Sequence, residues 1–175
     1  TAVIRFATVT PVRRQELAAS ILFAPVANFW FMTQSVYLGP TAADTPLNPL
    51  ARPLVVVDPR AGHGPGIGGF KDDSEVGVAL RAGHPVYFVM FRAQPEEGQT
   101  LADVMLAEAR FLEVVAERHP KSKARPAVIG NCQAGWAMAM LASLRPELFG
   151  PLMVVGAPLA YWSGSSTMNP MRYSG

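Results

Sequence analysis

Cysteine is almost absent from this sequence, with Cys132 the single example among 175 residues. One cysteine excludes an internal disulfide framework and any metal site built on a Cys-x-x-Cys pair. Low cysteine usage is also typical of proteins in a reducing compartment. We therefore expect a cytoplasmic protein with no structural disulfide, no metal and no resident cofactor.

Charge is scarce as well, since only 16% of the residues are charged and the formal net charge is +2. The lysines and arginines are scattered, whereas a nucleic-acid-binding protein gathers them on one face. We therefore expect no nucleic-acid partner. Half of the residues are hydrophobic, which excludes a disordered or fibrous chain. The length allows one domain with a real core but not two.

Residues 1–50 carry few recognisable signals. No charged residue occurs between Glu16 and Asp44, and the apolar stretch Leu17–Leu38 is long enough to be considered as a membrane span. Pro25 and several polar residues interrupt it. An apolar helix packed on the domain, or a leader segment, is therefore the favoured interpretation. We assign this segment no function.

The remainder, residues 51–175, follows a proline-rich linker at residues 41–53 and has the pattern of one domain. The predicted elements are strands at 54–57, 86–91, 127–129 and 152–155, and helices at 73–81, 101–118 and 133–144. This alternation predicts an α/β fold of the α/β-hydrolase type, with a doubly wound and mostly parallel sheet. Since the sequence begins without methionine and ends on Tyr173-Ser174-Gly175, we expect a fragment that holds only the N-terminal part of that fold.

Two of the predicted helices carry capping signals. Asp72 and Glu75 have the spacing of a capping box, which would open the first helix, and Gly83 would close it in the left-handed conformation. Thr100 would cap the second helix. The inner stripe of that helix is expected to comprise the apolar residues at helical spacing, which are Leu101, Val104, Met105, Phe111, Leu112 and Val115.

The most informative stretch is Val128–Trp136, in which an apolar strand runs into a turn of small residues and then directly into a helix. Its pattern, Gly-x-Cys-x-Ala-Gly, is typical of a nucleophile elbow, with Cys132 in place of the usual serine. Gly130, Ala134 and Gly135 are the small residues that let strand and helix approach each other.

Cys132 is therefore predicted to be a nucleophile. It follows the carboxyl end of a strand, where ligands bind in parallel sheets, and the start of a helix favours the thiolate form. The alternative is a small buried hydrophobic side chain, which is the role of most free cysteines. Its position between glycines, directly after a strand, favours the nucleophile.

Acyl transfer to a thiol needs hydrogen-bond donors for the oxyanion of the tetrahedral intermediate. In a nucleophile elbow one donor is the backbone N–H of the next residue, here Gln133, and the second comes from the loop after an earlier strand. The glycine-rich loop at residues 60–70 occupies that place, and His63-Gly64 within it resembles the His-Gly loops of esterases. A flexible surface loop is an equally good interpretation of these glycines.

The same loop contains Gly64-x-Gly66-x-x-Gly69, a literal match to the dinucleotide-binding fingerprint. In that fingerprint the glycines follow the strand directly and open the helix, whereas here they are separated from both. The next strand ends at Phe91-Arg92, which would suit only the phosphorylated ribose of NADP. Binding of NADP is the weakest of the alternatives.

No histidine in the sequence completes a triad with Cys132. His84 falls at the amino end of the predicted sheet, and His119 ends a helix beside a proline. His63 precedes the nucleophile, whereas the hydrolase order is nucleophile, acid, histidine. The general base and its acid are therefore expected after residue 175.

Four stretches resemble a bacterial domain family of unknown function whose members are often labelled poly(3-hydroxyalkanoate) synthetase-like. They are Val55–Phe70, Ala82–Pro85, Ile129–Trp136 and Asn169–Gly175. The resemblance covers Arg52 to Gly175, and the residues before Arg52 do not share it.

More distantly, the arrangement is similar to polyhydroxyalkanoate synthases, which have a Gly-x-Cys-x-Gly box on an α/β-hydrolase fold. This resemblance implies a cysteine that accepts 3-hydroxyacyl groups from coenzyme A, a role that falls on Cys132. Ala134 stands where the box has its second glycine, and Gly135 follows one place later.

We therefore expect an acyltransferase or hydrolase of the α/β-hydrolase type that acts on a hydroxyacyl thioester or ester, with coenzyme A as part of the substrate. The alternative is a non-catalytic module of the same fold that binds acyl chains, a polyester granule surface or a partner protein. A homo-oligomer is compatible with both.

Overall fold

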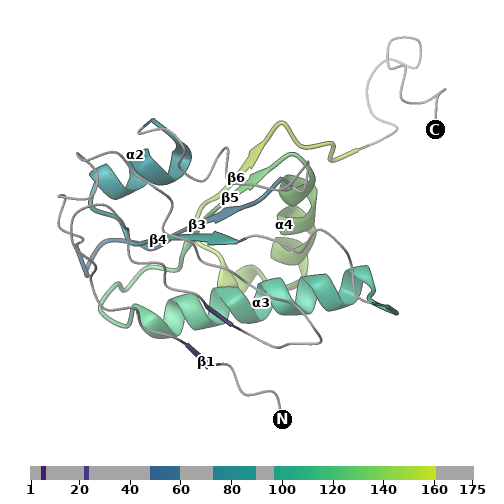
Figure 1. Cartoon of the computed structure of the whole chain (residues 1–175), viewed down its shortest axis with the longest axis horizontal. Coiled ribbons are helices and arrows are strands. Elements are labelled where there is room, and N and C mark those ends of the chain that lie inside the picture. The colour runs from purple at the N-terminus through teal and green to yellow at the C-terminus, as the bar shows by residue number, and fades with distance from the viewer. Residues whose placement is uncertain (1–4, 7–21, 24–47, 60–72, 90–96, 161–175) are drawn as a thin grey trace.

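The computed structural model of the chain describes residues 5–6, 22–23, 48–59, 73–89 and 97–160. The centre of the described part is a four-stranded parallel sheet with the strand order β4-β3-β5-β6 (Figure 1). The strands are β3 (Leu54–Val57), β4 (Val86–Val89), β5 (Ala127–Asn131) and β6 (Leu152–Val155). The helices between them are α2 (Glu75–Arg81), α3 (Leu101–Arg118) and α4 (Gln133–Leu144), with a short 3-10 helix η1 (Pro146–Leu148) before β6. The predicted alternation of strands and helices is confirmed, and the chain has an α/β fold.

The strand β3 lies in the middle of the sheet, with Val56 opposite Phe88 on one side and Ile129 on the other. Val55, Val56 and Val57 are almost completely buried. A continuous run of β-branched residues suits a strand that is covered on both faces. Burial of each such side chain contributes about 1.5–3 kcal/mol relative to exposure, so β3 is a major source of stability for the sheet.

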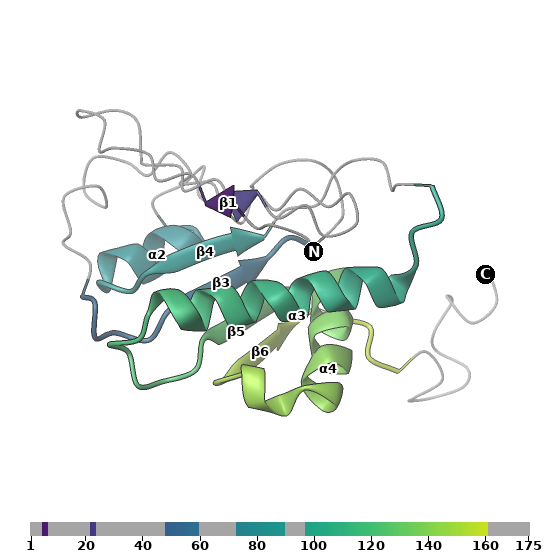
Figure 2. The same cartoon turned by 90° about the horizontal axis from the view of Figure 1, so that it is seen from below.

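Helices cover both faces of this sheet, with α2 on one side and α3 and α4 on the other (Figure 2). On the first face Val76 of α2 packs against Val56, Phe88 and Ile129. Successive side chains of a strand point to opposite faces, so the neighbours Val55 and Val57 belong to the second cluster. The residues that α3 and α4 add to that cluster are mostly apolar: Met105, Ala107, Ala109, Phe111, Leu112, Val114, Val115, Ala134, Met138 and Leu141.

The helix α2 begins differently from the prediction. Its N-cap is Ser74, whose hydroxyl oxygen accepts a hydrogen bond from the N–H of Gly77 at 3.0 Å. The predicted capping box of Asp72 and Glu75 is therefore wrong, because Ser74 starts the helix and the carboxylate of Glu75 has another partner. Asp72 itself lies outside the described residues.

The end of α2 matches the prediction. Gly83 has a positive φ of 82°. The N–H of Gly83 donates to Leu80 O at 2.9 Å and that of His84 donates to Ala79 O at 3.1 Å, which is the Schellman arrangement. Glycine suits this position because it adopts positive φ without steric cost.

The helix α3 starts with the predicted cap, since Thr100 and Asp103 form a reciprocal capping box. The expected inner stripe is confirmed from Val104 onward, since Val104 packs against the core and the later residues belong to it, but not for Leu101, which is 44% exposed. The 18 residues of α3 span about 27 Å at 1.5 Å per residue, whereas a four-residue strand spans about 13 Å. The first turn of α3 therefore extends past the sheet.

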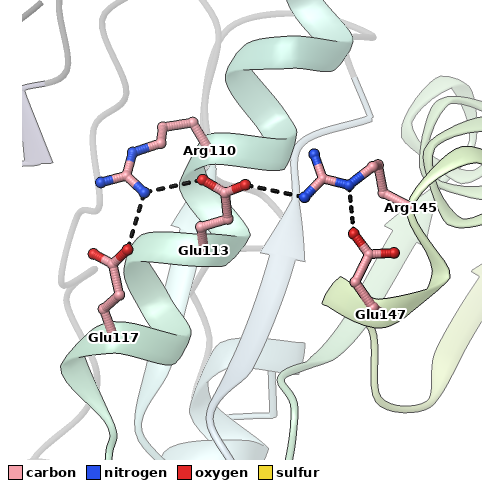
Figure 3. A network of polar contacts seen from close by, with 5 residues as sticks. All are labelled: Arg110, Glu113, Glu117, Arg145 and Glu147. Atoms are coloured by element: carbon pink, nitrogen blue, oxygen red, sulfur yellow. Dashed lines mark hydrogen bonds and ion pairs between the residues drawn. The ribbon is translucent and has the colours of Figure 1, made fainter.

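Ion pairs connect the end of α4 to the side of α3 (Figure 3). Arg110 of α3 contacts Glu113 at 2.9 Å and Glu117 at 3.0 Å. Arg145, which follows α4, contacts Glu113 at 3.2 Å and also pairs with Glu147. Exposed pairs of this kind add little stability, so the network mainly fixes how the chain leaves α4.

The N-terminal segment departs from the expected apolar helix at the residues that are described. Leu22–Phe23 form a short strand, β2, which pairs antiparallel with β1 (Arg5–Phe6). The rest of residues 1–47 lies outside the described part, as do residues 90 and 91 of the strand predicted at 86–91. None of the described helices is long and apolar enough to cross a membrane.

Candidate functional site

The strand order creates a switch point between β3 and β5. The strand that follows β3 in the chain, β4, lies on one side of β3, whereas β5 and β6 lie on the other side of β3. In open parallel sheets, ligands bind outside the carboxyl ends of the strands at such a point. Val57, the last residue of β3, lies opposite Gly130 of β5, and Cys132 follows two residues later. Cys132 therefore lies at the edge of the sheet where a ligand site is expected.

The backbone of Cys132 adopts an unusual conformation, with φ 51° and ψ −116°. Within the described residues it is the only non-glycine residue with a positive φ. Such conformations cost about 1–3 kcal/mol and are concentrated at functional sites. The residue is partly exposed to solvent. The strand, sharp turn and helix thus follow one another as predicted for this stretch, and the role of Cys132 as a nucleophile stays a prediction.

Backbone hydrogen bonds hold this turn on both sides of Cys132. Its N–H donates to Val155 O of β6 at 2.9 Å, and its carbonyl oxygen accepts from the N–H of Gly135 at 3.0 Å. A strained conformation persists only where the surrounding structure determines it strongly. The neighbouring strand and the first turn of α4 provide part of that support.

The small residues predicted around Cys132 do allow the close approach of β5 and α4. A Cβ added to Gly130 would lie 2.8 Å from both Ala134 O and Gly135 Cα. A Cβ added to Gly135 would lie 2.4 Å from Ala157 Cβ and 2.9 Å from Gly130 O. Ala134 is completely buried at this crossing. On the helix side of this crossing, Gly135 is therefore the position where a side chain does not fit. The methyl group of the neighbouring Ala134 is accommodated.

Gln133 is the first residue of α4, and amides at this position have no carbonyl partner within a helix. Its N–H is therefore a suitable donor for an anion beside Cys132. The Gln133 side chain is exposed and accepts a hydrogen bond from Nε1 of Trp136. The second expected donor, at His63 and Gly64, lies outside the described residues and remains a prediction.

The two described histidines lie at the opposite end of the sheet, as was predicted for His84. His84 precedes β4, and its Nδ1 lies 2.8 Å from Arg52 O. His119 follows α3, and its Nε2 lies 2.7 Å from the hydroxyl of Tyr87. Burial, and to a lesser extent the charge of Arg118, lowers the pKa of His119 below its usual value. Both histidines thus have hydrogen-bond partners at that end of the sheet, and within the described residues no histidine accompanies Cys132.

The structure adds two polar residues to this edge that the sequence patterns missed. Asn131, the last residue of β5, is 6% exposed, and its Nδ2 donates to Glu75 Oε2 at 2.9 Å. Burial raises the pKa of Glu75 above its ordinary value, while the hydrogen bond from Asn131 opposes that rise. The sequence did contain a signal for both residues. Asn131 ends a strand and Glu75 follows the loop after another strand, so a parallel sheet brings both to its carboxyl edge. The sequence analysis missed this signal because it assigned Glu75 to a capping box.

Neither a metal site nor a dinucleotide site gains support from the described residues. They contain no group of three or more His, Cys, Asp or Glu side chains that could hold a metal ion. The fingerprint glycines from Gly64 to Gly69 lie outside the described residues. However, α2 begins at Glu75, six positions after Gly69, so these glycines do not open the helix as the fingerprint requires.

No solved structure is significantly similar to the chain. The chain is 63% identical over 129 residues to a Rhizobium meliloti protein named "Uncharacterized protein in ackA 5'region". The aligned part is 74% of this chain but only 18% of that protein, so the chain spans less than a fifth of the relative's length.

The sequence pattern of one protein family matches residues 32–175. This match begins 20 positions before Arg52, so the expectation that the family resemblance starts at Arg52 is wrong. It covers most of the chain, and the chain therefore belongs to the family described as "Protein of unknown function (DUF3141)".

Proposed function

We propose that Cys132 is the acyl-accepting nucleophile of an acyltransferase or hydrolase of the α/β-hydrolase type. The observation that carries the proposal is the strained backbone of Cys132 at the carboxyl edge of the sheet, beside the switch point. A cysteine that served only for packing would need neither the positive φ nor the partial exposure. Backbone strain at the edge of the sheet where ligands bind is typical of active sites, in which the strained conformation positions a reacting group.

The substrate is a hydroxyacyl thioester or a related ester. The similarity of the Gly-x-Cys box to that of polyhydroxyalkanoate synthases supports this class, and Gly135 keeps the close strand–helix approach. A thiolate is both a good nucleophile and a good leaving group, which suits exchange between thioesters. Coenzyme A enters as part of the substrate and not as a resident cofactor.

The reaction begins when the sulfur of Cys132 attacks the carbonyl carbon of the thioester. The carbonyl π electrons move onto oxygen, and the N–H of Gln133 donates a hydrogen bond to this oxyanion. When the tetrahedral intermediate collapses, the bond between the carbonyl carbon and the sulfur of coenzyme A breaks. The proton lost by Cys132 ends on the departing thiol. Water or a hydroxyl group then attacks the acyl carbon, the bond between that carbon and the sulfur of Cys132 breaks, and the proton of the attacking group returns to the thiol of Cys132.

Proton transfer in this reaction needs a base, and His84 and His119 are too far along the sheet to serve. We assign that role to a part of the protein outside the described residues. A nucleophile that loses its base keeps little of its rate, so activity is a property of the full-length protein.

The test is acylation of the full-length protein with a 3-hydroxyacyl coenzyme A thioester, followed by peptide mass spectrometry. The expected result is an acyl adduct on Cys132 and loss of turnover in Cys132→Ala. Cys132→Ser is the matched variant, because it keeps the shape of the side chain but offers a weaker nucleophile. Absence of any adduct, together with unchanged turnover in Cys132→Ala, would refute the proposal.

A second candidate is a non-catalytic module that binds acyl chains or a polyester granule surface. The observation in its favour is a set of exposed apolar side chains on α4 and β6, which are Met140, Leu144, Met153 and Val155. Binding of polyester granules by both wild-type protein and Cys132→Ala, with no acylation of either, would favour this function over the first.

A further inference from the structure

The turn at Cys132 is held from a third direction, by α2. The bonds to Val155 and Gly135 run between backbone atoms and do not depend on the side chains of the turn. The third contact joins two side chains, Asn131 and Glu75, at 2.9 Å. It is therefore the support that a change of side chain can remove.

The fold explains why this contact reaches the turn. Residues two apart on a strand face the same side of the sheet, and Ile129 packs against Val76 of α2. Asn131 is two residues further on, so its amide also projects toward α2. Glu75 is the first residue of that helix and directly precedes Val76, which is 3% exposed. The contact thus connects a firmly packed helix end to the residue before Cys132.

The contact depends on the acceptor oxygen of Glu75 and not on its negative charge. Glu75 is partly buried, and burial is the main cause that raises the pKa of its carboxyl group. Removing a carboxylate from water costs free energy that a single hydrogen bond does not fully restore. An amide in the same place would avoid this cost and still accept the hydrogen bond from Asn131, so the contact needs the acceptor oxygen and not the charge.

We propose that Glu75 and Asn131 are positioning residues for Cys132, and that their hydrogen bond holds the strained turn so that the thiol faces the substrate carbonyl. This inference rests on the proposed acyl transfer at Cys132. Without the bond, the backbone around Cys132 relaxes from φ 51° toward ordinary conformations and carries the sulfur away. A misplacement of about 1 Å can lower a rate about 100-fold.

Four variants separate positioning from general stabilisation. Glu75→Ala removes the acceptor, and Asn131→Ala removes the donor. Glu75→Gln keeps an acceptor oxygen of the same reach and removes only the charge. Val78→Ala is the matched control, because it shortens an exposed side chain on the same helix.

The measurement is the kinetics of acylation of the full-length protein by a 3-hydroxyacyl coenzyme A thioester. Glu75→Ala and Asn131→Ala should lower kcat about tenfold to a hundredfold and leave KM within about threefold, since misplacement affects the transition state more than binding. Glu75→Gln and Val78→Ala should remain within about threefold of wild type. Wild-type kcat in Glu75→Ala, or an equal loss in Glu75→Gln and Glu75→Ala, would overturn the inference.

A second readout needs no substrate. Amide hydrogen exchange of residues 130–136 should be about tenfold faster in Glu75→Ala than in wild type, and unchanged in Glu75→Gln. If wild-type protein is not acylated, the proposed function fails, and exchange still tests whether the contact holds the turn. Equal exchange in Glu75→Ala and wild type would then overturn the inference by itself.

Discussion

Glycine at position 132 should make the turn more stable than alanine does. The backbone at φ 51° and ψ −116° costs a residue with a Cβ about 1–3 kcal/mol, whereas glycine adopts positive φ freely. At an ordinary helix or strand position, glycine is less stable than alanine by roughly 0.5–1 kcal/mol. The difference leaves Cys132→Gly more stable than Cys132→Ala by up to about 2.5 kcal/mol, with a midpoint of about 1.25 kcal/mol, which reverses the usual order.

Native-state hydrogen exchange with mass spectrometry measures this local free energy in the full-length protein. A difference of about 1.4 kcal/mol corresponds to a tenfold difference in the protection of amides in β5 and the first turns of α4. Ser143, exposed near the end of α4, supplies the control pair. There alanine should be more stable than glycine by about 1 kcal/mol. Equal or greater protection in Cys132→Ala than in Cys132→Gly would show that the turn is not strained.

Three further changes have defined outcomes. Gly130→Ala should destabilise the fold by about 1–3 kcal/mol in urea unfolding, because its Cβ would meet the backbone of α4 at 2.8 Å; an unchanged midpoint would contradict this packing. His119 has a lowered pKa, so the unfolded state binds more protons just below pH 6.5. Its stability contribution is present above pH 6.5 and lost as the pH falls toward the folded pKa, and this dependence should vanish in His119→Gln. Glu75 has a raised pKa, so the wild type is most stable relative to Glu75→Gln below pH 4.5 and loses that advantage as the pH rises. Thermal melts at pH 4 and pH 7 should therefore show Glu75→Gln gaining on wild type at pH 7.

Local signals were sufficient to predict most of the elements. The bounds of β3, α4 and β6 match the prediction because adjacent residues define each element. The two strands are short apolar runs rich in β-branched residues, and α4 lies between a turn of small residues and Arg145-Pro146. Thr100 and Gly83 act locally too, so their capping roles were also predictable. The strand order was not, since the pairing of Leu54 with Ala127 depends on contacts that no short stretch encodes.

One part of the candidate site could also be predicted from adjacent residues, and another part could not. The turn at Cys132 was predictable because strand, small residues and helix are contiguous, and its positive φ agrees with that pattern. The contact between Glu75 and Asn131 was not, because the two residues are 56 positions apart. A carboxylate near a helix start satisfies a local rule equally well, and only the tertiary structure decides which partner it takes.

The position of β3 beside β5 has a consequence for how the chain folds. Paired residues in β3 and β4 (54 and 86) are 32 positions apart, and those in β5 and β6 (128 and 152) are 24 apart, whereas those in β3 and β5 (54 and 127) are 73 apart. Closing a loop about two to three times longer costs about 0.7–1 kcal/mol more in chain entropy, and pairings of high sequence separation slow folding. The strands β3 and β5, which flank the switch point, are therefore the neighbouring strands whose pairing costs the most chain entropy in the described parallel sheet. Glu75 meets Asn131 only when β5 lies beside β3, so the support of the turn around Cys132 depends on the strand pairing with the largest sequence separation in the described parallel sheet.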